Sequence, residues 1–243
     1  MVESTVSYEE KIKEPSLFVH KVSLDASDIK EIVDKKKTKF FAKLGFLKPK
    51  HEDIDCEAIS LYYEPFQVVK ARYYVDYYKR NTYNIKVDEK VIEVILLGQK
   101  LIPESLKGVK KVLKRPYKEL KLDAQEQVLY EAAASFAQDR SGHEIDPVKL
   151  PSAPAMTDPK QALAEYGEKV RKPKISPDKL IDVIRERIVS KPSETEKVIE
   201  EVFEVSENTL IYTPIYEARC RYLKTGEIKI IPISGVTGKP FNP

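Results

Sequence analysis

Aromatic and basic side chains that could bind nucleic acid gather in one segment of the 243-residue chain, ARYYVDYYKRNTY at 71–83. In an extended strand, successive side chains alternate between the two faces of a sheet, so Tyr73 faces one side and Tyr74 the other. Single-stranded nucleic-acid binders combine aromatic side chains for base stacking with cations for phosphate contact on such a face. The alternative is structural, because tyrosine-rich strands also pack well in cores and protein interfaces.

A second basic region follows at 105–121, where lysines recur at helical spacing. The pattern predicts a helix over 105–115 with one cationic face, ended by Pro116. Such a face can contact RNA, DNA or an anionic membrane surface, or it can simply be solvated. Together with arginines and tyrosines of the expected strands, the candidate binding residues are Arg72, Tyr74, Tyr78, Arg80, Lys107, Lys110, Lys111, Lys114, Arg115, Lys118, Arg219 and Arg221.

Residues for metal binding or nucleophilic catalysis are scarce. The two Cys and three His are too few and too far apart for a structural zinc site. Cys56 and Cys220 are expected to be small buried residues, with a disulfide between them as the alternative. The segment SGVTGKPF at 234–241 superficially resembles a phosphate-binding loop, but its spacing differs from that motif and Pro240 blocks a following helix. We expect a β-turn there and no metal or cofactor, and catalysis is the least favoured function.

The composition narrows the class of protein. The 42 Lys+Arg and 39 Asp+Glu give a net charge of +3, so no whole-molecule field favours nucleic acid, and any basic surface is local. No apolar run is long enough to span a membrane, and the polar start does not have the pattern of a signal peptide, which predicts a cytoplasmic location. Abundant Lys and Glu with few labile amides are typical of thermophiles.

Two parts of the chain resemble each other and indicate an internal duplication. Residues 61–73, LYYEPFQVVKARY, align without gaps with 210–222, LIYTPIYEARCRY, and the two segments share Leu, Tyr, Pro, Arg and Tyr at matching positions. Upstream, DASDIKEIV at 25–33 resembles SPDKLIDVI at 176–184 at nearly equal spacing. We therefore predict two copies of one α+β unit, each a helix followed by a β-hairpin.

Local signals place the elements of each copy. In the first copy they predict a helix over 28–43, a strand over 62–78, a turn at 79–81, a returning strand over 82–87 and an apolar run at 91–97. In the second copy Ser176 and Pro177 open a helix, the Ser193 capping box opens another within 193–203, and a hairpin turns at 224–226.

The positions of the prolines and of one alanine-rich segment predict the remaining elements. Pro65 and Pro214 are placed at strand starts or sheet edges, because proline cannot donate to a central ladder. The Ala-rich segment 124–139 predicts a helix, the Pro-rich segment 143–159 a semi-rigid linker, and 159–171 a short helix.

The predicted fold is an α+β protein in which two copies of a helix–β-hairpin unit form an intramolecular pseudo-dimer with a helical insert. The expected organisation is a first repeat with an N-terminal extension at 1–100, a helical insert and linker at 101–172, and a second repeat at 173–243.

The duplicated Tyr-x-Pro strand, with its basic-x-Arg-Tyr ending, resembles a module in conserved archaeal proteins of unassigned function. It is also similar to small β-modules attached to zinc ribbons and ATPases, although the cysteine ligands usual there are absent here. The resemblance covers about 35 residues per copy. It implies a binding or scaffolding role and identifies no catalytic residue.

These observations favour a non-enzymatic binding or adaptor protein that acts within a larger cytoplasmic complex through its tyrosine-rich sheet. The alternative is a nucleic-acid or ribosome-binding protein that uses the basic helix and the Tyr/Arg-rich sheet face. A protein partner is expected, nucleic acid is the alternative partner, and no membrane span or small-molecule ligand is evident.

Overall fold

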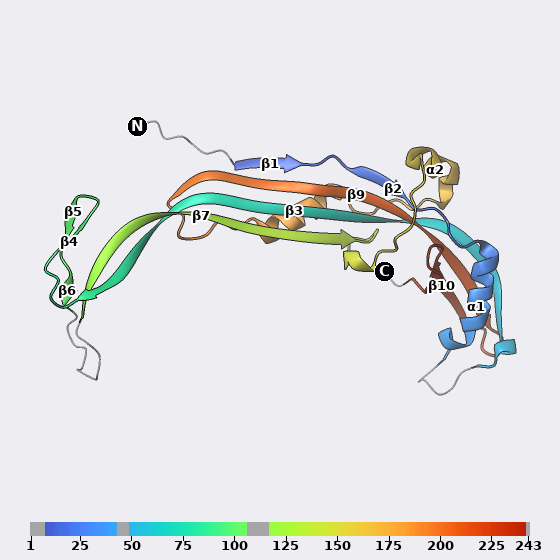
Figure 1. Cartoon of the computed structure of the whole chain (residues 1–243). Coiled ribbons are helices and arrows are strands. Elements are labelled where there is room, and N and C mark those ends of the chain that lie inside the picture. Colours follow the sequence, from blue (N-terminus) through green and yellow to red (C-terminus); the bar gives the residue numbers. More distant parts are fainter. Residues whose placement is uncertain (1–7, 43–48, 106–116, 242–243) are drawn as a thin grey trace. The chain divides into compact units, whose positions relative to one another are not determined.

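A computed structural model describes residues 8–42, 49–105 and 117–241 (Figure 1). The fold is mixed α+β, with a large mixed sheet and few helices, and this confirms the predicted class. Three long strands dominate it, namely β3 (Ile54–Asp88), β7 (Tyr117–Gln138) and β9 (Lys197–Tyr222). Backbone contacts divide the chain into two compact units, a first of 1–9, 73–132 and 190–202 and a second of 10–72, 133–189 and 203–243.

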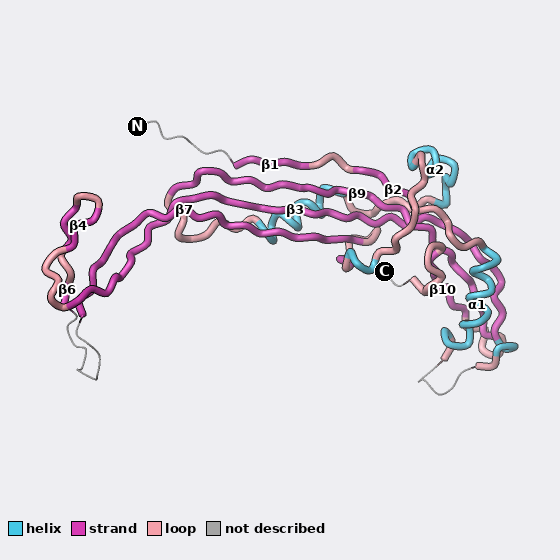
Figure 2. The backbone as a smooth tube through the Cα atoms, viewed as in Figure 1, coloured by secondary structure: helices cyan, strands magenta, loops and turns pink. Residues whose placement is uncertain are grey.

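The large sheet has the strand order β1-β9-β3-β7-β6, and β2 and β10 also pair with β9 while β8 pairs with β7. Its shorter strands are β1 (Tyr8–Ile12), β2 (Ser16–Val19), β6 (Glu104–Ser105), β8 (Glu144–Ile145) and β10 (Ile228–Ser234). A separate two-stranded sheet consists of β4 (Val94–Leu96) and β5 (Gln99–Leu101). Strands make up most of the tube in Figure 2.

Three α-helices agree with the local sequence signals. They are α1 (Ala26–Phe40), α2 (Pro159–Tyr166) and α3 (Pro177–Ile188), and the 3-10 turns are η1 (His51–Asp53), η2 (Pro147–Lys149) and η3 (Gly167–Lys169). Asp25 caps α1 by accepting hydrogen bonds from two backbone N–H groups, and Ser176 caps α3. The buried stripe of α3 contains Ile181, Ile184 and Ile188, as predicted. Within the described residues, no helix has the length and apolar character needed to cross a membrane.

Two predicted features are wrong, one in the first copy and one in the insert. Residues 79–81 do not turn, because β3 continues through them to Asp88, and 82–87 belong to the same strand. The Ala-rich segment 124–139 lies in β7 rather than in a helix. Exposed and half-buried residues alternate along β7, and the Gln127 amide donates to Asp76 of β3 at 2.9 Å. Pairing with the neighbouring strand therefore outweighs the helix propensity of alanine.

The predicted helix within 193–203 is also wrong, because β9 begins at Lys197 and buries Val202 and Phe203. The Ser193 hydroxyl donates to Glu194 instead of capping a helix. The helix predicted over 105–115 lies almost entirely outside the described residues. The hairpin predicted at 224–226 is confirmed, since β9 and β10 pair antiparallel on either side of it and Gly226 adopts a φ of 73°.

Pro65 and Pro214 do not start their strands, since both lie well inside β3 and β9. The position of Pro214 is explained by its neighbours. The pairing of β2 with β9 ends at Tyr212, and the pairing of β10 with β9 begins at Ile215. The missing N–H of Pro214 therefore falls where one partner strand replaces another, so that no ladder hydrogen bond is lost.

The Pro-rich segment 143–159 is fixed to the second unit rather than free. It contains β8 and η2, and Met156 N–H donates to Val19 O at 2.8 Å while Lys21 N–H donates to Pro154 O at 2.9 Å. The predicted short helix over 159–171 is α2 followed by η3.

The second unit has two apolar clusters. In the first, Ile29 and Val33 of α1 pack against Ala218 of β9 and Ile231 of β10. The second is centred on Val19, Tyr63 and Tyr212, and α2 contributes to it. In the first unit Tyr73, Val75 and Tyr77 are buried on one face of β3. The tyrosines of that face therefore belong to the core, which was one of the two interpretations of the segment.

Candidate interaction surfaces

The structure places a carboxylate beside several of the candidate cations and tyrosines of β3. In the second unit, Arg72 pairs with Glu204 of β9 at 2.6 Å. In the first unit, Arg80 pairs with Glu196 at 3.0 Å, and the Tyr74 hydroxyl donates to Glu200 at 3.2 Å. A phosphate approaching these cations would meet the carboxylates of the neighbouring strand. The charges of this strand are therefore compensated within the protein.

The other described candidates divide between the two units, with Tyr78 and Lys118 in the first and Arg219 and Arg221 in the second. Tyr78 is half-buried on β3, and Arg219 is exposed on β9. Arg221 pairs with Glu57 at 2.9 Å, and the Lys118 amine donates to Val91 O at 2.8 Å. The remaining candidates fall outside the described residues, namely Lys107, Lys110, Lys111, Lys114 and Arg115.

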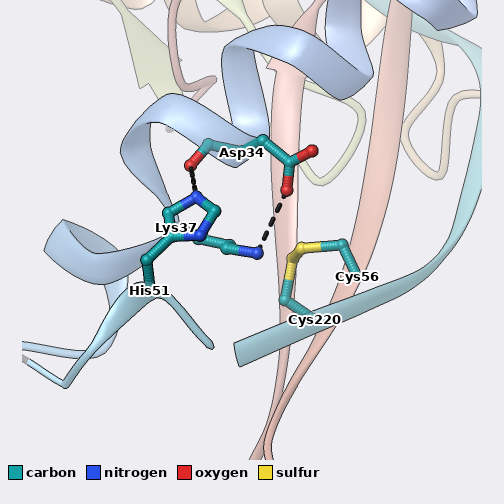
Figure 3. The surroundings of a disulfide bond; sticks show 5 residues. All are labelled: Asp34, Lys37, His51, Cys56 and Cys220. Carbon is teal, nitrogen blue, oxygen red and sulfur yellow. Dashed lines mark hydrogen bonds and ion pairs between the residues drawn. A yellow bond between two sulfur atoms is a disulfide. The ribbon is translucent and has the colours of Figure 1, made fainter. Parts of the chain in front are cut away.

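Cys56 of β3 and Cys220 of β9 form a disulfide with an S–S distance of 2.09 Å (Figure 3). The expectation of two unpaired buried cysteines is therefore wrong. The bond lies beside the cluster that packs α1 against β9 and β10. Close by, Lys37 pairs with the Asp34 carboxylate at 3.1 Å, and His51 Nε2–H donates to the Asp34 carbonyl at 2.9 Å. This bond covalently links β3 to β9 within the second unit.

A network of charges in the second unit surrounds the buried Glu64, and the partners of Glu64 are half-buried. Glu64 of β3 accepts from Arg171 at 3.2 Å and lies 3.5 Å from Arg140. Arg171 also pairs with Glu217 at 2.7 Å, and its guanidinium stacks 3.4 Å from the Tyr62 ring centroid. Burial raises the pKa of Glu64, against the opposing effect of the two guanidinium groups, and burial raises the pKa of Tyr62 to about 12. These charges compensate one another.

One small cavity among the described residues adjoins this network at Arg140. The cavity lined by Arg140, Asp139 and Gln67 has a volume of only about 10 Å³, which is roughly the space of one water molecule. Across the described ranges, no group of three or more His, Cys, Asp or Glu side chains is arranged to hold a metal ion. The network links β3, β9 and the segment that precedes α3 through the contacts of Arg171 with Glu64 and Glu217.

An exposed apolar hairpin in the first unit is a feature that sequence reasoning missed. It spans 92–102 and contains β4 and β5, which pair antiparallel. Ile92 is 81% exposed, Ile95 62%, Ile102 79% and Leu97, in the turn, 97%. The sequence reveals the apolar run at 91–97, but a run of this kind normally predicts a buried strand, and nothing local signals that it is exposed.

Comparisons with protein-family models, with curated proteins and with solved structures give no significant match to this chain.

Proposed function

We propose that the chain is a non-enzymatic binding or adaptor protein that contacts a protein partner through the apolar hairpin 92–102 of its first unit. The single observation that supports this proposal most strongly is the exposure of Leu97 in the hairpin turn. A cytoplasmic location and a thermophilic archaeal origin remain predictions.

The turn itself argues for a role outside folding. Leu97 has a φ of 50° and Gly98 a φ of 77°, and a two-residue turn with both values positive normally contains Asn-Gly. A left-handed conformation costs a residue such as leucine about 1–2 kcal/mol. A large apolar side chain that is 97% exposed at this position gains no burial within the described chain to offset that cost. Contact with a partner would provide the missing burial.

Backbone geometry favours a protein as the partner. β4 and β5 pair only with each other among the described residues, so each strand has an outer edge without a partner strand. Open strand edges are costly in hydrocarbon, where no water satisfies their N–H and C=O groups. An extended segment of another protein can pair with such an edge and place apolar side chains against Ile95 and Leu97. We propose this mode of strand addition.

The test uses the full chain with Leu97→Asn, which suits the turn better than leucine and so preserves or stabilises the hairpin. Leu129→Asn on β7 is the matched control, because Leu129 is 58% exposed in the same unit. Partners are captured from the native host after cross-linking, with and without nuclease, and cross-links are mapped by mass spectrometry. We expect a nuclease-resistant partner linked near Lys100, reduced at least tenfold by Leu97→Asn and unchanged by Leu129→Asn.

Two outcomes would contradict this function. Equal capture by the wild-type protein and Leu97→Asn would exclude the hairpin as the docking element. Flotation of the wild-type protein with lipid vesicles, lost in Leu97→Asn, would identify a membrane instead of a protein as the occupant.

The second candidate function is nucleic-acid or ribosome binding. The lysine-rich sequence at 107–115 and the exposed Arg219 favour it, whereas the carboxylates beside Arg72 and Arg80 weaken it. Binding that depends on phosphate contacts falls steeply with salt. Fluorescence anisotropy with single-stranded RNA across salt concentrations tests this function, and a log–log slope near zero would exclude it.

We also propose that the two sequence copies form a pseudo-two-fold pair in the second unit. Arg171 N–H donates to Tyr63 O at 3.1 Å, and His20 N–H donates to Tyr212 O at 2.9 Å. Tyr63 and Tyr212 are matching positions of the repeat. The next matching pair follows the same rule, because Arg171 binds Glu64 and His20 binds Thr213 through its side chain at 3.0 Å. These paired contacts support an equivalence that goes beyond sequence.

A transplanted pair tests the duplication. If the positions are equivalent, the neutral His–Thr pair should replace the Arg171–Glu64 pair, and Arg171→His/Glu64→Thr should be more stable than Arg171→Ala/Glu64→Ala by about 1–2 kcal/mol. Urea unfolding measures both variants. Equal stability of the two double variants would remove this support for the pseudo-two-fold pair.

A further inference from the structure

We infer that a cavity in the second unit is a binding site for an apolar organic anion that carries a phosphate or carboxylate group. The cavity has a volume of about 330 Å³, at the small end of the range of ligand pockets in proteins. It lies between the Pro-rich segment, the end of β10 and the residues that follow the 235–238 turn. Its lining contains no residue of the charge network.

The side chains that line the cavity carry positive charge, which favours an anionic ligand. Lys149 and Lys239 both line the cavity, no Asp or Glu does, and neither lysine has a carboxylate partner among the described residues. Ser152 and Thr237 add hydroxyl groups. By contrast, Lys70 and Arg72 of the same unit are each paired with a glutamate. Two uncompensated cations at one cavity favour a ligand with a negative group that accepts hydrogen bonds.

The other side chains that line the cavity are largely apolar, which favours a ligand with an aromatic or aliphatic part. Phe66 of β3 is 1% exposed and meets Phe241 edge to face, with 5.6 Å between the ring centroids. Ile145 and Leu150 contribute aliphatic surface. A small inorganic anion would leave the half-buried side chains of Ile145 and Leu150 uncovered, whereas a ligand with an aromatic or aliphatic body would bury them.

The walls of the cavity are held in place by backbone hydrogen bonds. Ser234 N–H donates to Lys239 O at 2.9 Å, and Phe241 N–H donates to Pro232 O at 2.8 Å. The Ser234 hydroxyl accepts from the N–H groups of Val236 and Thr237, each at 3.2 Å. Since these N–H groups are already used within the turn, the anion is held by side chains rather than by a backbone cradle of the phosphate-loop type. A preformed site of this kind binds at a smaller ordering cost.

The experiment compares three probes, 2-naphthyl phosphate, 2-naphthoate and neutral 2-naphthol, by isothermal titration calorimetry with the full chain. We expect one or both anions to bind, with 2-naphthol at least tenfold weaker, and the stronger anion identifies the headgroup. Lys149→Gln and Lys239→Gln should each weaken the anion about tenfold and leave 2-naphthol unchanged. Lys160→Gln, an exposed lysine of α2 outside the cavity, is the matched control and should have no effect.

A second variant tests the location without altering charge. Ser152 is exposed at the cavity, so Ser152→Trp should fill the space and abolish binding of all three probes while thermal unfolding stays close to that of the wild-type protein. The inference would be overturned if the anions bound as well to both lysine variants, if 2-naphthol bound as tightly as the anions, or if no probe bound at millimolar concentration.

Discussion

Removal of the Cys56–Cys220 disulfide is expected to destabilise the second unit more than any surface change. The bond closes a loop between residues 164 apart in sequence. In the chain-entropy account, a loop of this length restricts the unfolded chain by about 5 kcal/mol, and this is an upper value if the unfolded chain retains structure. For a chain of this size, that corresponds to a fall in the unfolding temperature of about 10–20 °C.

Thermal unfolding followed by circular dichroism, with and without a reductant, measures this effect. Cys56→Ala/Cys220→Ala is the appropriate variant, because Cys220 is fully buried among Ile29, Val33 and Ala218, and serine would bury a hydroxyl there. The double variant should unfold near the temperature of the reduced wild-type protein and should not respond to the reductant. The double variant therefore serves as the control for any effect of the reductant that is unrelated to the disulfide.

Two results would refute this reasoning. If oxidised and reduced protein unfold within about 2 °C of each other, the loop-closure argument fails. If the denatured, unreduced protein presents two reactive thiols, the bond itself is absent.

Two further perturbations test the second unit. Burial lowers the pKa of His20 below its ordinary value of 6.5, so below pH 6.5 the unfolded chain binds a proton that the folded chain does not. Stability should therefore fall as the pH decreases from 6.5 to the folded-state pKa, by at most about 1.4 kcal/mol per pH unit, and His20→Gln should remove this slope in urea unfolding at several pH values. Gly238→Ala should cost about 1–3 kcal/mol, because a Cβ would lie 2.8 Å from Ile32 Cδ1 at a φ of 65°; a urea midpoint equal to that of the wild-type protein would contradict this steric argument.

Features of the fold that depend on neighbouring residues were predictable from the sequence. Asp25 and Ser176 cap helices through hydrogen bonds to groups two or three residues away, and Gly226 permits the turn between β9 and β10. Segments whose conformation depends on a distant strand were not predictable. Residues 124–139 have the composition of a helix and 193–203 begins with a capping box, yet both segments contribute to long strands that pair with β3.

The same limit applies to the candidate surfaces. The sequence identifies Arg72 and Tyr74 as possible ligand-binding residues, but their partners Glu204 and Glu200 lie 132 and 126 residues away. Only the pairing of β3 with β9 brings these groups together. The disulfide has the same origin, because its two cysteines occupy neighbouring strands and nothing in the local sequence of either one indicates the other.

Acidic and basic side chains of this protein neutralise one another, both in the overall composition and in the contacts between strands. A chain with 42 basic and 39 acidic residues has little excess charge, and the contacts of β3 with β9 show that compensation operates between adjacent side chains. A sequence-level count of cations therefore overstates the surface available to an anion. Lys149 and Lys239 are therefore better candidates for anion binding than the arginines of β3, Arg72 and Arg80. The two lysines share one apolar cavity and have no carboxylate partner in the described part of the chain. Anion binding by the second unit should then be selective for ligands that fit the cavity, and it should depend weakly on the overall charge of the protein.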